Sequence, residues 1–149
     1  LWNIKYRYDK TGNVLEEVKY DAERKMIHRI IYKYDTKGNE VEKVEYDSDG
    51  NLKKKESTKY DKKGNRVEKV SYDANGNIKD KDKYKYDAKG NRVEWAWYDA
   101  NDKLEYIYIY SYDEKGNKFK EIEYDLKTIS GEERLVPVEE DIWEFTYWD

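Results

Sequence analysis

The sequence contains no cysteine, one histidine and one proline among its 149 residues. Without cysteine it can form no disulfides, and it offers neither a thiolate nucleophile nor a thiolate metal site. A nucleophilic triad needs a base, and the only imidazole belongs to His28, for which we expect a structural role. No apolar run approaches the ~18 residues that a transmembrane helix requires, so we expect no membrane span.

Charged residues, by contrast, make up 43% of the chain, where roughly a quarter is usual. Such a composition can indicate disorder, but disordered chains have few aromatic residues and a high net charge. Here aromatic residues make up 16%, including 17 Tyr and 5 Trp, and the net charge is only −4. We therefore expect a folded chain, one ordinary domain or a short repeat array, with little conventional core.

A repeated dipeptide organises the sequence. The pair Tyr-Asp recurs with spacings that alternate between 12 and 14, at positions 8/9, 20/21, 34/35, 46/47, 60/61, 72/73, 86/87, 98/99, 112/113 and 124/125. These spacings define a repeat of 26 residues, present about five times. In seven of the copies Gly-Asn follows, with the glycine three residues after the Asp.

Each Tyr-Asp-x-x-Gly-Asn segment predicts a hairpin turn. The Asp side chain can bond the backbone two residues on, and Gly accepts the left-handed conformation that ends a three-residue loop built on a type I turn. Between the turns the sequence alternates with period two and is rich in strand-forming residues. The predicted register pairs Asp9 with Asn13, Tyr8 with Val14, and Tyr6 with Glu16.

Under this register the even-numbered positions share one face throughout, and that face carries most of the tyrosines. The odd-numbered face carries a band of lysines, namely Lys43, Lys53, Lys55, Lys59, Lys69, Lys79, Lys81, Lys83 and Lys85. Such a band could attract a nucleic acid. The net negative charge and the lack of interleaved aromatics favour a solvated face instead, and we expect no nucleic-acid partner.

The expected fold is all-β: an antiparallel meander of ten or eleven strands built from 26-residue hairpin repeats, forming a strongly twisted single-layer sheet. The stagger between hairpins would also suit a closed barrel of ten strands with a polar interior.

Residues 1–125 are expected to form five repeats and residues 126–149 a capping segment. In that segment 126–133 predicts a longer connection, and Pro137 suits an edge strand. The alternating end of the chain, through Tyr147 and Trp148, is expected to pack against Trp95, Ile107 and Phe119.

The segments Tyr32-Lys33-Tyr34-Asp35-Thr36-Lys37-Gly38-Asn39 and Tyr84-Lys85-Tyr86-Asp87-Ala88-Lys89-Gly90-Asn91 resemble the YD repeats of the rearrangement-hotspot (RHS) family. The resemblance covers residues 4 to about 125. In that family, β-hairpin repeats spiral into a hollow shell around a toxin domain, and members are usually bacterial and secreted or surface-associated. This chain has Gly-Asn where typical members have Gly-Arg, is too short to enclose a toxin, and lacks a protease motif. The resemblance therefore implies the β-hairpin repeat fold and a secreted or cell-surface location. It does not imply that the chain encloses a toxin or acts as a protease.

Paired carboxylates are the best enzymatic candidates. Glu68 is expected opposite Asp82 on the tyrosine-bearing face, and two carboxyls beside aromatics are what glycoside hydrolysis requires. Because acidic residues recur with the repeat, we favour a structural role and expect no enzyme, with a glycoside hydrolase as a distant alternative. Residues 47–51 and 73–77 resemble the start of a calcium loop but lack its later Glu, so we expect turns, no metal and no cofactor.

The aromatic residues near the C-terminal end form the most suggestive surface. The predicted register places Trp95, Trp97, Ile107 and Ile109 on one face and Tyr106, Tyr108 and Tyr110 on the other, and these seven are the predicted ligand-binding residues. Sugar rings stack on such platforms, and protein partners use Tyr and Trp as anchors. We therefore expect a non-enzymatic interaction or structural module that binds a protein or glycan partner, with a carbohydrate-binding module as the first alternative.

Overall fold

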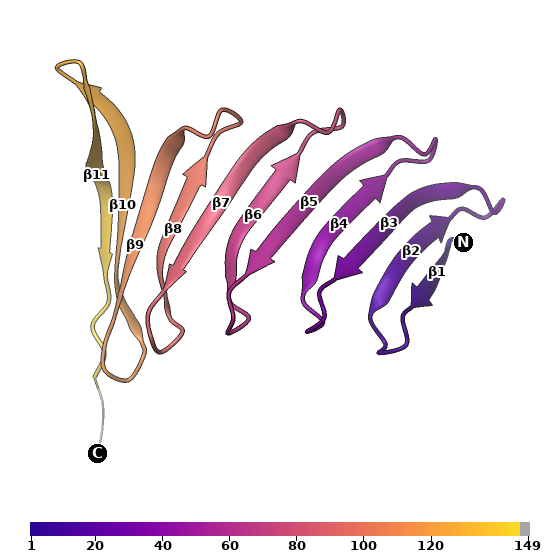
Figure 1. Ribbon diagram of the computed structural model, residues 1–149, viewed down its shortest axis with the longest axis horizontal. Helices are drawn as coiled ribbons and strands as arrows, with labels where there is room; N and C mark the ends of the chain where they lie inside the picture. The colour runs from indigo at the N-terminus through magenta and orange to yellow at the C-terminus, as the bar shows by residue number, and fades with distance from the viewer. Residues whose placement is uncertain (147–149) are drawn as a thin grey trace. The chain divides into compact units, whose positions relative to one another are not determined.

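The computed structural model describes residues 1–146 as antiparallel strands joined by short turns (Figure 1). The eleven strands are β1 (Asn3–Tyr8), β2 (Val14–Tyr20), β3 (Met26–Tyr34), β4 (Glu40–Tyr46), β5 (Leu52–Tyr60), β6 (Arg66–Tyr72), β7 (Ile78–Tyr86), β8 (Arg92–Tyr98), β9 (Leu104–Tyr112), β10 (Lys118–Ile129) and β11 (Glu132–Ile142). The expected all-β meander is confirmed. Across the residues that the structure describes, no helix is long and apolar enough to cross a membrane.

The strands follow one another in a single sheet in the order β1 to β11. β1 and β11 are not neighbours in that order, so the hydrogen-bond ladder does not close, and the closed-barrel alternative is wrong. By its contacts the chain divides into two compact units, residues 1–79 and 80–149. The expected division into repeats and a capping segment at residue 125 stays a prediction.

The turns have the predicted geometry at nine of the ten Tyr-Asp sites. In the first, the Asp9 amide donates to the Asn13 carbonyl at 2.9 Å, and the Asp9 carboxylate accepts from the amides of Thr11 and Asn13 at 2.8 and 2.9 Å. Gly12 has a φ of 90°, in the left-handed region. The tenth site is different, because Asp125 lies inside β10, opposite Tyr106 and Val136, and forms no turn.

A β-bulge follows the turn in the described hairpins, and the predicted register missed it. Tyr8 pairs with Val14 as expected, but Arg7 then pairs with Glu16 and Tyr6 with Glu17, so Leu15 is an extra residue. The same shift recurs in the later hairpins, for example between Lys59 and Tyr60. The predicted pairing of Tyr6 with Glu16 is therefore wrong, because two residues on one strand oppose one on its partner.

Each bulge exchanges the odd and even positions between neighbouring strands, so the expectation of an even-numbered face throughout is also wrong. In unit 1, one face carries the cross-strand row Glu16, Ile31, Val44, Lys55 and Tyr72. The other face carries the row Tyr32, Lys43, Glu56 and Ser71. Consequently Lys43 and Lys55, expected in one lysine band, lie on opposite faces.

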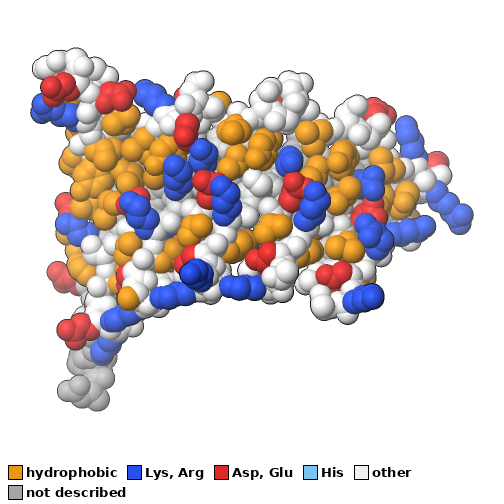
Figure 2. Space-filling view, viewed as in Figure 1, with side chains coloured by type: hydrophobic (Ala, Val, Ile, Leu, Met, Phe, Trp, Pro, Cys, Tyr) orange, Lys and Arg blue, Asp and Glu red, His pale blue; other side chains and the backbone are white. Residues whose placement is uncertain are grey.

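Opposite charges pair across the strands of unit 1. On the first face Glu16 lies between Arg7 and Arg29, at 3.1 and 2.6 Å, and Glu42 lies between Lys33 and Lys55, at 2.7 and 3.0 Å. On the second face Glu56 pairs across the strands with Lys69 of β6 at 2.6 Å and along its own strand with Lys54 at 2.9 Å. Figure 2 shows one face of the molecule, on which positive and negative side chains form small groups separated by hydrophobic ones. Such cross-strand pairs are each worth roughly 0.2–1 kcal/mol.

The core is small, as expected. Within residues 1–146 the buried hydrophobic side chains are Ile30, Val44, Val70, Tyr84, Ala96 and Tyr110, and no polar or charged side chain is buried. They come from both faces of the sheet. This fits a single layer, in which each face buries only a few side chains among the adjacent side chains of that face.

The C-terminal part is more regular than the sequence suggested. Residues 126–129 continue β10, and Ser130 and Gly131, both with positive φ (52° and 85°), make a two-residue turn into β11. The expected longer connection across 126–133 is therefore wrong, because a two-residue turn of this hand suits the twist of antiparallel strands. Pro137 lies in the edge strand β11, as predicted. The Trp143 amide donates to the Phe119 carbonyl at 2.8 Å, whereas Tyr147 and Trp148 lie outside the described residues.

Candidate functional site: an aromatic face with an acidic border

Strands β8 and β9 of unit 2 place their aromatic side chains on one face. Trp95 is paired with Tyr108 and Trp97 with Tyr106, and residues directly opposite in an antiparallel pair point to the same side. Ile107 pairs with Ala96 and Ile109 with Glu94, so the two isoleucines point to the other side. The structure thus places five of the seven predicted residues on one face. The predicted separation of the tryptophans from the tyrosines is wrong because Glu105, at the start of β9, is an extra residue that forms a bulge. We call the surface of Trp95, Trp97, Tyr106, Tyr108 and Tyr110 the aromatic face.

The five rings form one continuous cluster. Trp97 stacks on Tyr106 with ring centres 5.3 Å apart and planes 4° from parallel, and Trp95 stacks on Tyr108 at 5.1 Å and 14°. Trp95 also meets Tyr106 edge to face at 5.7 Å, and Tyr108 stacks on Tyr110 at 6.4 Å. Tyr110 is buried and the other four rings are partly exposed. Each such pair contributes about 0.5–1.5 kcal/mol beyond the area it buries.

Two carboxylates hold the polar ends of this cluster. The Trp95 indole Nε1–H donates to Asp82 of β7 at 2.7 Å, and the Tyr108 hydroxyl donates to Glu123 of β10 at 2.6 Å. The bond to Glu123, together with burial, raises the pKa of Tyr108 well above its ordinary value. Burial and the nearby carboxylates, Asp82 first among them, likewise raise the pKa of Tyr106. Tyr106 and Tyr108 are therefore neutral at physiological pH, and the two hydrogen bonds orient the Trp95 and Tyr108 rings.

An acidic border lies beside the rings on β10 and β11. Glu123 is directly opposite Glu139, and Glu121 is directly opposite Asp141, on the same side of the sheet as Tyr108. These four carboxylates and Tyr108 line a hollow of about 140 Å³. Glu121 is also in contact with Lys118. Like charges directly opposite one another are destabilising. The border shares this arrangement with Lys127 and Arg134 farther along the same two strands, and it departs from the opposite-charge pairs of the repeats, such as Lys59 with Glu68.

The aromatic face and the acidic border present ring edges, hydroxyls and carboxylates side by side. A sugar ring stacks on the open face of an aromatic ring, and one face of Trp95 and one face of Trp97 are here taken up by Tyr108 and Tyr106. Tyr and Trp at the centre with a polar rim are typical of protein-binding surfaces. The carboxylates of the border favour a partner that carries positive charge.

The two carboxylates considered for glycoside hydrolysis have partners of their own. Glu68 pairs with Lys59 at 2.8 Å in unit 1, and Asp82 accepts the Trp95 indole in unit 2. In the turns that resemble calcium loops, the Asp47 carboxylate accepts the amides of Asp49 and Asn51, both at 2.9 Å. No group of three or more potential metal-ligating side chains occurs in the described part of the chain.

The acidic border was not among the predicted site residues. Glu121, Glu123, Glu139 and Asp141 are scattered among many acidic residues, and only the register of β10 and β11 brings them together. The sequence does carry one signal: Val138-Glu139-Glu140-Asp141 is acidic and lacks the interleaved lysines of the preceding strands.

Comparisons with known proteins give only distant likenesses. No family model matches the sequence, and no curated protein is significantly similar to it. Among solved structures, TcdB2-TccC3 matches with 14% identity and a TM-score of 0.39 over 84% of this chain, which spans 8% of that one. A porin-like protein from Bacteroides uniformis matches with 9% identity and a TM-score of 0.33, over 91% of this chain and 88% of that one. A Bacteroides fragilis protein of unknown function matches with 12% identity and a TM-score of 0.28, over 96% and 92%. Likenesses at this level do not assign the chain to a family.

Proposed function

We propose that this chain is a non-enzymatic interaction module, a sheet of β-hairpin repeats that binds a protein partner through the aromatic face and its acidic border. The observation that carries the proposal is the opposition of Glu123 to Glu139 and of Glu121 to Asp141 beside the partly exposed rings. In the repeats, by contrast, directly opposite charged residues such as Lys59 and Glu68 or Lys85 and Glu94 have opposite charges. Four carboxylates facing one another therefore have a cost in folding that a basic partner would offset.

The proposed partner presents Arg or Lys side chains to the border and apolar groups to the ring edges. Rings that are already stacked and hydrogen-bonded lose little freedom on binding, and rigid aromatic anchors of this kind often dominate binding energy. The YD-repeat resemblance of residues 4 to about 125 supports a structural repeat module and, as part of the proposal, a secreted or surface-associated bacterial protein.

The test compares two short peptides of equal length and aromatic content, one with four Arg residues and one with four Glu residues, by NMR titration of the isotope-labelled chain. We expect shifts at residues 95–110 and 121–141 with the basic peptide only. Charge reversal by Glu139→Lys with Asp141→Lys should weaken binding about tenfold or more, since close charge pairs at interfaces are worth several kcal/mol.

Glu140→Lys is the matched control. Glu140 lies between the two substituted residues, but it is opposite Ile122 and in contact with Lys120, on the other side of the sheet. Its reversal should leave peptide binding within about twofold, because it adds to β11 the same charge as Glu139→Lys alone but away from the rings. An equal loss of peptide affinity in the double variant and in Glu140→Lys would refute the proposal, as would binding of the acidic peptide. Binding in a glycan array that is lost with Trp97→Ala would instead establish the carbohydrate-binding alternative.

A further inference from the structure

Asn75 is the one asparagine of this chain that precedes a glycine, among ten asparagines in all. Asn75 and Gly76 are both exposed and lie in the turn 73–77, which joins β6 to β7. An asparagine loses its side-chain amide when the backbone nitrogen of the next residue attacks the side-chain carbonyl carbon. Glycine favours this attack, because it has no Cβ to shield the nitrogen and its backbone is the most adaptable. A Cβ built on Gly76 would have no atom within 4 Å, so the surroundings are open as well.

Most of the other asparagines are held by a turn aspartate. Their Nδ2 groups donate to the carboxylate that begins the turn, at 2.9 to 3.3 Å, in Asn13, Asn39, Asn51, Asn65, Asn77, Asn91 and Asn117. Asn101 Nδ2 donates to Asp99 in the same way, at 3.3 Å. In the described part of the chain the Asn75 side chain makes no such bond, and only its backbone amide donates to Asp73, at 2.9 Å. The Asn75 side chain can therefore turn toward the next backbone nitrogen without losing a partner.

The reaction at Asn75 needs only water and hydroxide. Hydroxide takes the proton of the Gly76 amide, and the nitrogen attacks Cγ of Asn75. The bond from Cγ to the side-chain nitrogen then breaks, and that nitrogen leaves as ammonia with a proton from water, which restores the hydroxide. Water opens the resulting succinimide ring at either carbonyl carbon. Opening at Cγ gives aspartate, and opening at the main-chain carbon gives isoaspartate.

The folded turn controls how often this attack can occur. The Gly76 amide donates to the Asp73 carbonyl at 3.1 Å, so its nitrogen becomes available only when the turn opens. Exposed turns open locally at a much smaller free energy than the whole fold. We therefore expect the rate at Asn75 to follow the opening of this one turn and not the unfolding of the sheet.

The aspartate product fits the turn. In the turn 47–51 the residue before the glycine is Asp49, and its amide donates to the Asp47 carboxylate at 2.9 Å, as that of Asn75 does to Asp73. The amide of Gly50 likewise donates to the Asp47 carbonyl at 3.2 Å. Aspartate at position 75 should therefore leave the turn unchanged.

The isoaspartate product does not fit in this way. It routes the backbone through the side chain and so adds one carbon between residues 75 and 76. The bond from the Asp73 amide to the Asn77 carbonyl, at 2.9 Å, closes the loop that contains this extra carbon. A three-residue loop has a fixed length, so the added carbon should weaken that bond and loosen the ends of β6 and β7.

We propose that Asn75 is a site of spontaneous and irreversible modification, at which loss of the side-chain amide places isoaspartate in the turn between β6 and β7 and loosens this hairpin. Aspartate forms alongside and adds a negative charge without disturbing the turn. The site is independent of the aromatic face and its acidic border.

The test incubates the purified chain in mildly alkaline buffer and samples it over time. Peptide mapping by mass spectrometry follows the conversion of each asparagine, and methylation by an isoaspartyl methyltransferase measures isoaspartate. Asn101 is the comparator within the molecule, because it follows the same Asp-Ala pair at the same turn position but precedes Asp102. We expect Asn75 to convert about tenfold faster than Asn101 or more, which a difference of ~1.4 kcal/mol in the barrier provides.

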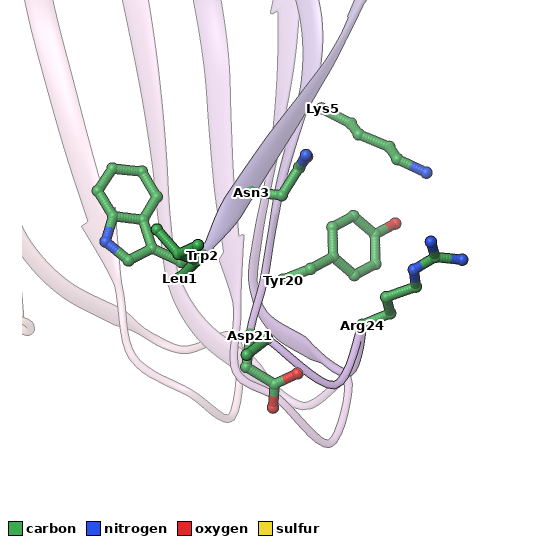
Figure 3. Close-up of a pocket in the computed structure, with 8 residues that line it drawn as sticks. Leu1, Trp2, Asn3, Lys5, Tyr20, Asp21 and Arg24 are labelled. Carbon is green, nitrogen blue, oxygen red and sulfur yellow. The ribbon is translucent and has the colours of Figure 1, made fainter.

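The glycine position of these turns accommodates a side chain, so Gly76 can be replaced. Asp102 and Arg24 occupy this position with φ values of 64° and 65°. Figure 3 shows the Arg24 side chain extending from its turn beside Tyr20, where both line a hollow of about 720 Å³. Gly76→Asp is therefore expected to fold.

Gly76→Asp is the matched variant, because it makes residues 73–76 identical to residues 99–102. It should slow the conversion of Asn75 to the rate of Asn101. Asp73→Ala should act in the opposite direction, because it removes the carboxylate that holds the turn closed. We expect it to speed the conversion about three- to tenfold, the range for loss of one hydrogen bond.

Hydrogen exchange then separates the two products. The isoaspartate fraction of the incubated chain, isolated by chromatography, should exchange faster than the parent at residues 72–78. The variant Asn75→Asp should exchange like the parent there, because the turn 47–51 already contains aspartate at this position.

Three results would overturn the proposal. One is an unchanged Asn75 in the folded chain under conditions that convert an unfolded peptide of residues 70–80. Another is conversion of Asn75 and Asn101 at equal rates. The third is an isoaspartate fraction whose turn exchanges as slowly as that of the parent.

Discussion

Two turns place a residue with a side chain where the others have glycine. Arg24 and Asp102 have φ values of 65° and 64°, in the same left-handed region as Gly64 at 90°. For an L-residue this conformation costs about 1–2 kcal/mol, a cost that glycine avoids. We expect Arg24→Gly to raise the free energy of unfolding by about 0.5–1 kcal/mol and Gly64→Ala to lower it by about 1 kcal/mol, both measured by urea denaturation.

Gly64 is a clean position for this comparison. A Cβ built there would meet no atom within 4 Å, so the change acts on the backbone conformation and not through a steric clash. Arg24→Ala, which keeps the left-handed strain and removes the guanidinium, is the control for the side chain itself. If Arg24→Gly and Arg24→Ala raise the free energy of unfolding equally, the charge of Arg24 and not backbone strain causes the increase.

At the scale of one hairpin, the turn aspartates connect stability to pH. The Thr11 hydroxyl is the largest of the hydrogen-bonding influences that lower the pKa of Asp9 from 3.8 to about 2, and Asn13 adds to it. Six further turn aspartates have lowered pKa values, namely Asp35, Asp47, Asp61, Asp73, Asp87 and Asp99. A carboxyl whose folded pKa is depressed stabilises the fold above its unfolded pKa and loses that contribution as the pH falls through the folded value.

We therefore expect the urea midpoint to fall steadily between about pH 4 and pH 2. Asp9→Asn keeps an acceptor oxygen in the turn but does not titrate. The difference in unfolding free energy between the parent and Asp9→Asn should be largest at pH 7 and shrink toward pH 2. A difference that is constant across this range would show that the Asp9 charge contributes nothing.

Substitutions in β11 distinguish the effect of the acidic border on stability from its effect on binding. Glu139 and Asp141 face Glu123 and Glu121, so Glu139→Gln with Asp141→Asn should relieve repulsion and raise the free energy of unfolding by about 0.5 kcal/mol. The same variant should bind the basic peptide more weakly. Glu140→Gln, which removes the contact with Lys120, should instead lower stability slightly. A double variant less stable than the parent would show that the border carboxylates support the fold.

The turns and strands of these hairpins could be predicted from the sequence because their signals are local. Asp9 and Gly12 lie within one turn, and the alternation of each strand lies within the strand. The bulge has no such local signal, because the alternation is intact on both sides of Leu15. A signal across strands existed: Arg7 with Glu16, Lys33 with Glu42 and Lys59 with Glu68 are complementary only in the bulged register.

At the scale of the whole chain, the same bulge explains why the candidate site was only partly predicted. All five rings of the aromatic face were named from the sequence, but the expected register placed Trp95 and Tyr108 on opposite sides. The partner carboxylates Asp82 and Glu123 come from strands on either side of the rings, so residue type and spacing alone could not select them. Their role depends on the register of three strand pairs at once.

The two units differ in what holds them together, and we expect them to differ in stability. Residues 80–149 contain the stacked aromatic cluster. Residues 1–79 instead bury the aliphatic side chains Ile30, Val44 and Val70 beside partly exposed ion pairs, which contribute little each. Repeat arrays approximate a sum of local terms, so their parts can open separately. In hydrogen exchange followed by mass spectrometry, amides of β8 and β9 should exchange most slowly and those of β1 and β2 fastest.

Trp97→Ala tests whether the two units are stabilised separately, because it removes the ring that stacks on Tyr106 at 5.3 Å. Loss of a large partly buried aromatic should lower the protection of β8 and β9 by about 2–3 kcal/mol, somewhat below the range for fully buried rings. Exchange in β1 to β4 should stay unchanged if stability is local. A uniform loss of protection from β1 to β10 would show one cooperative sheet, in which the ion pairs of unit 1 and the rings of unit 2 support each other.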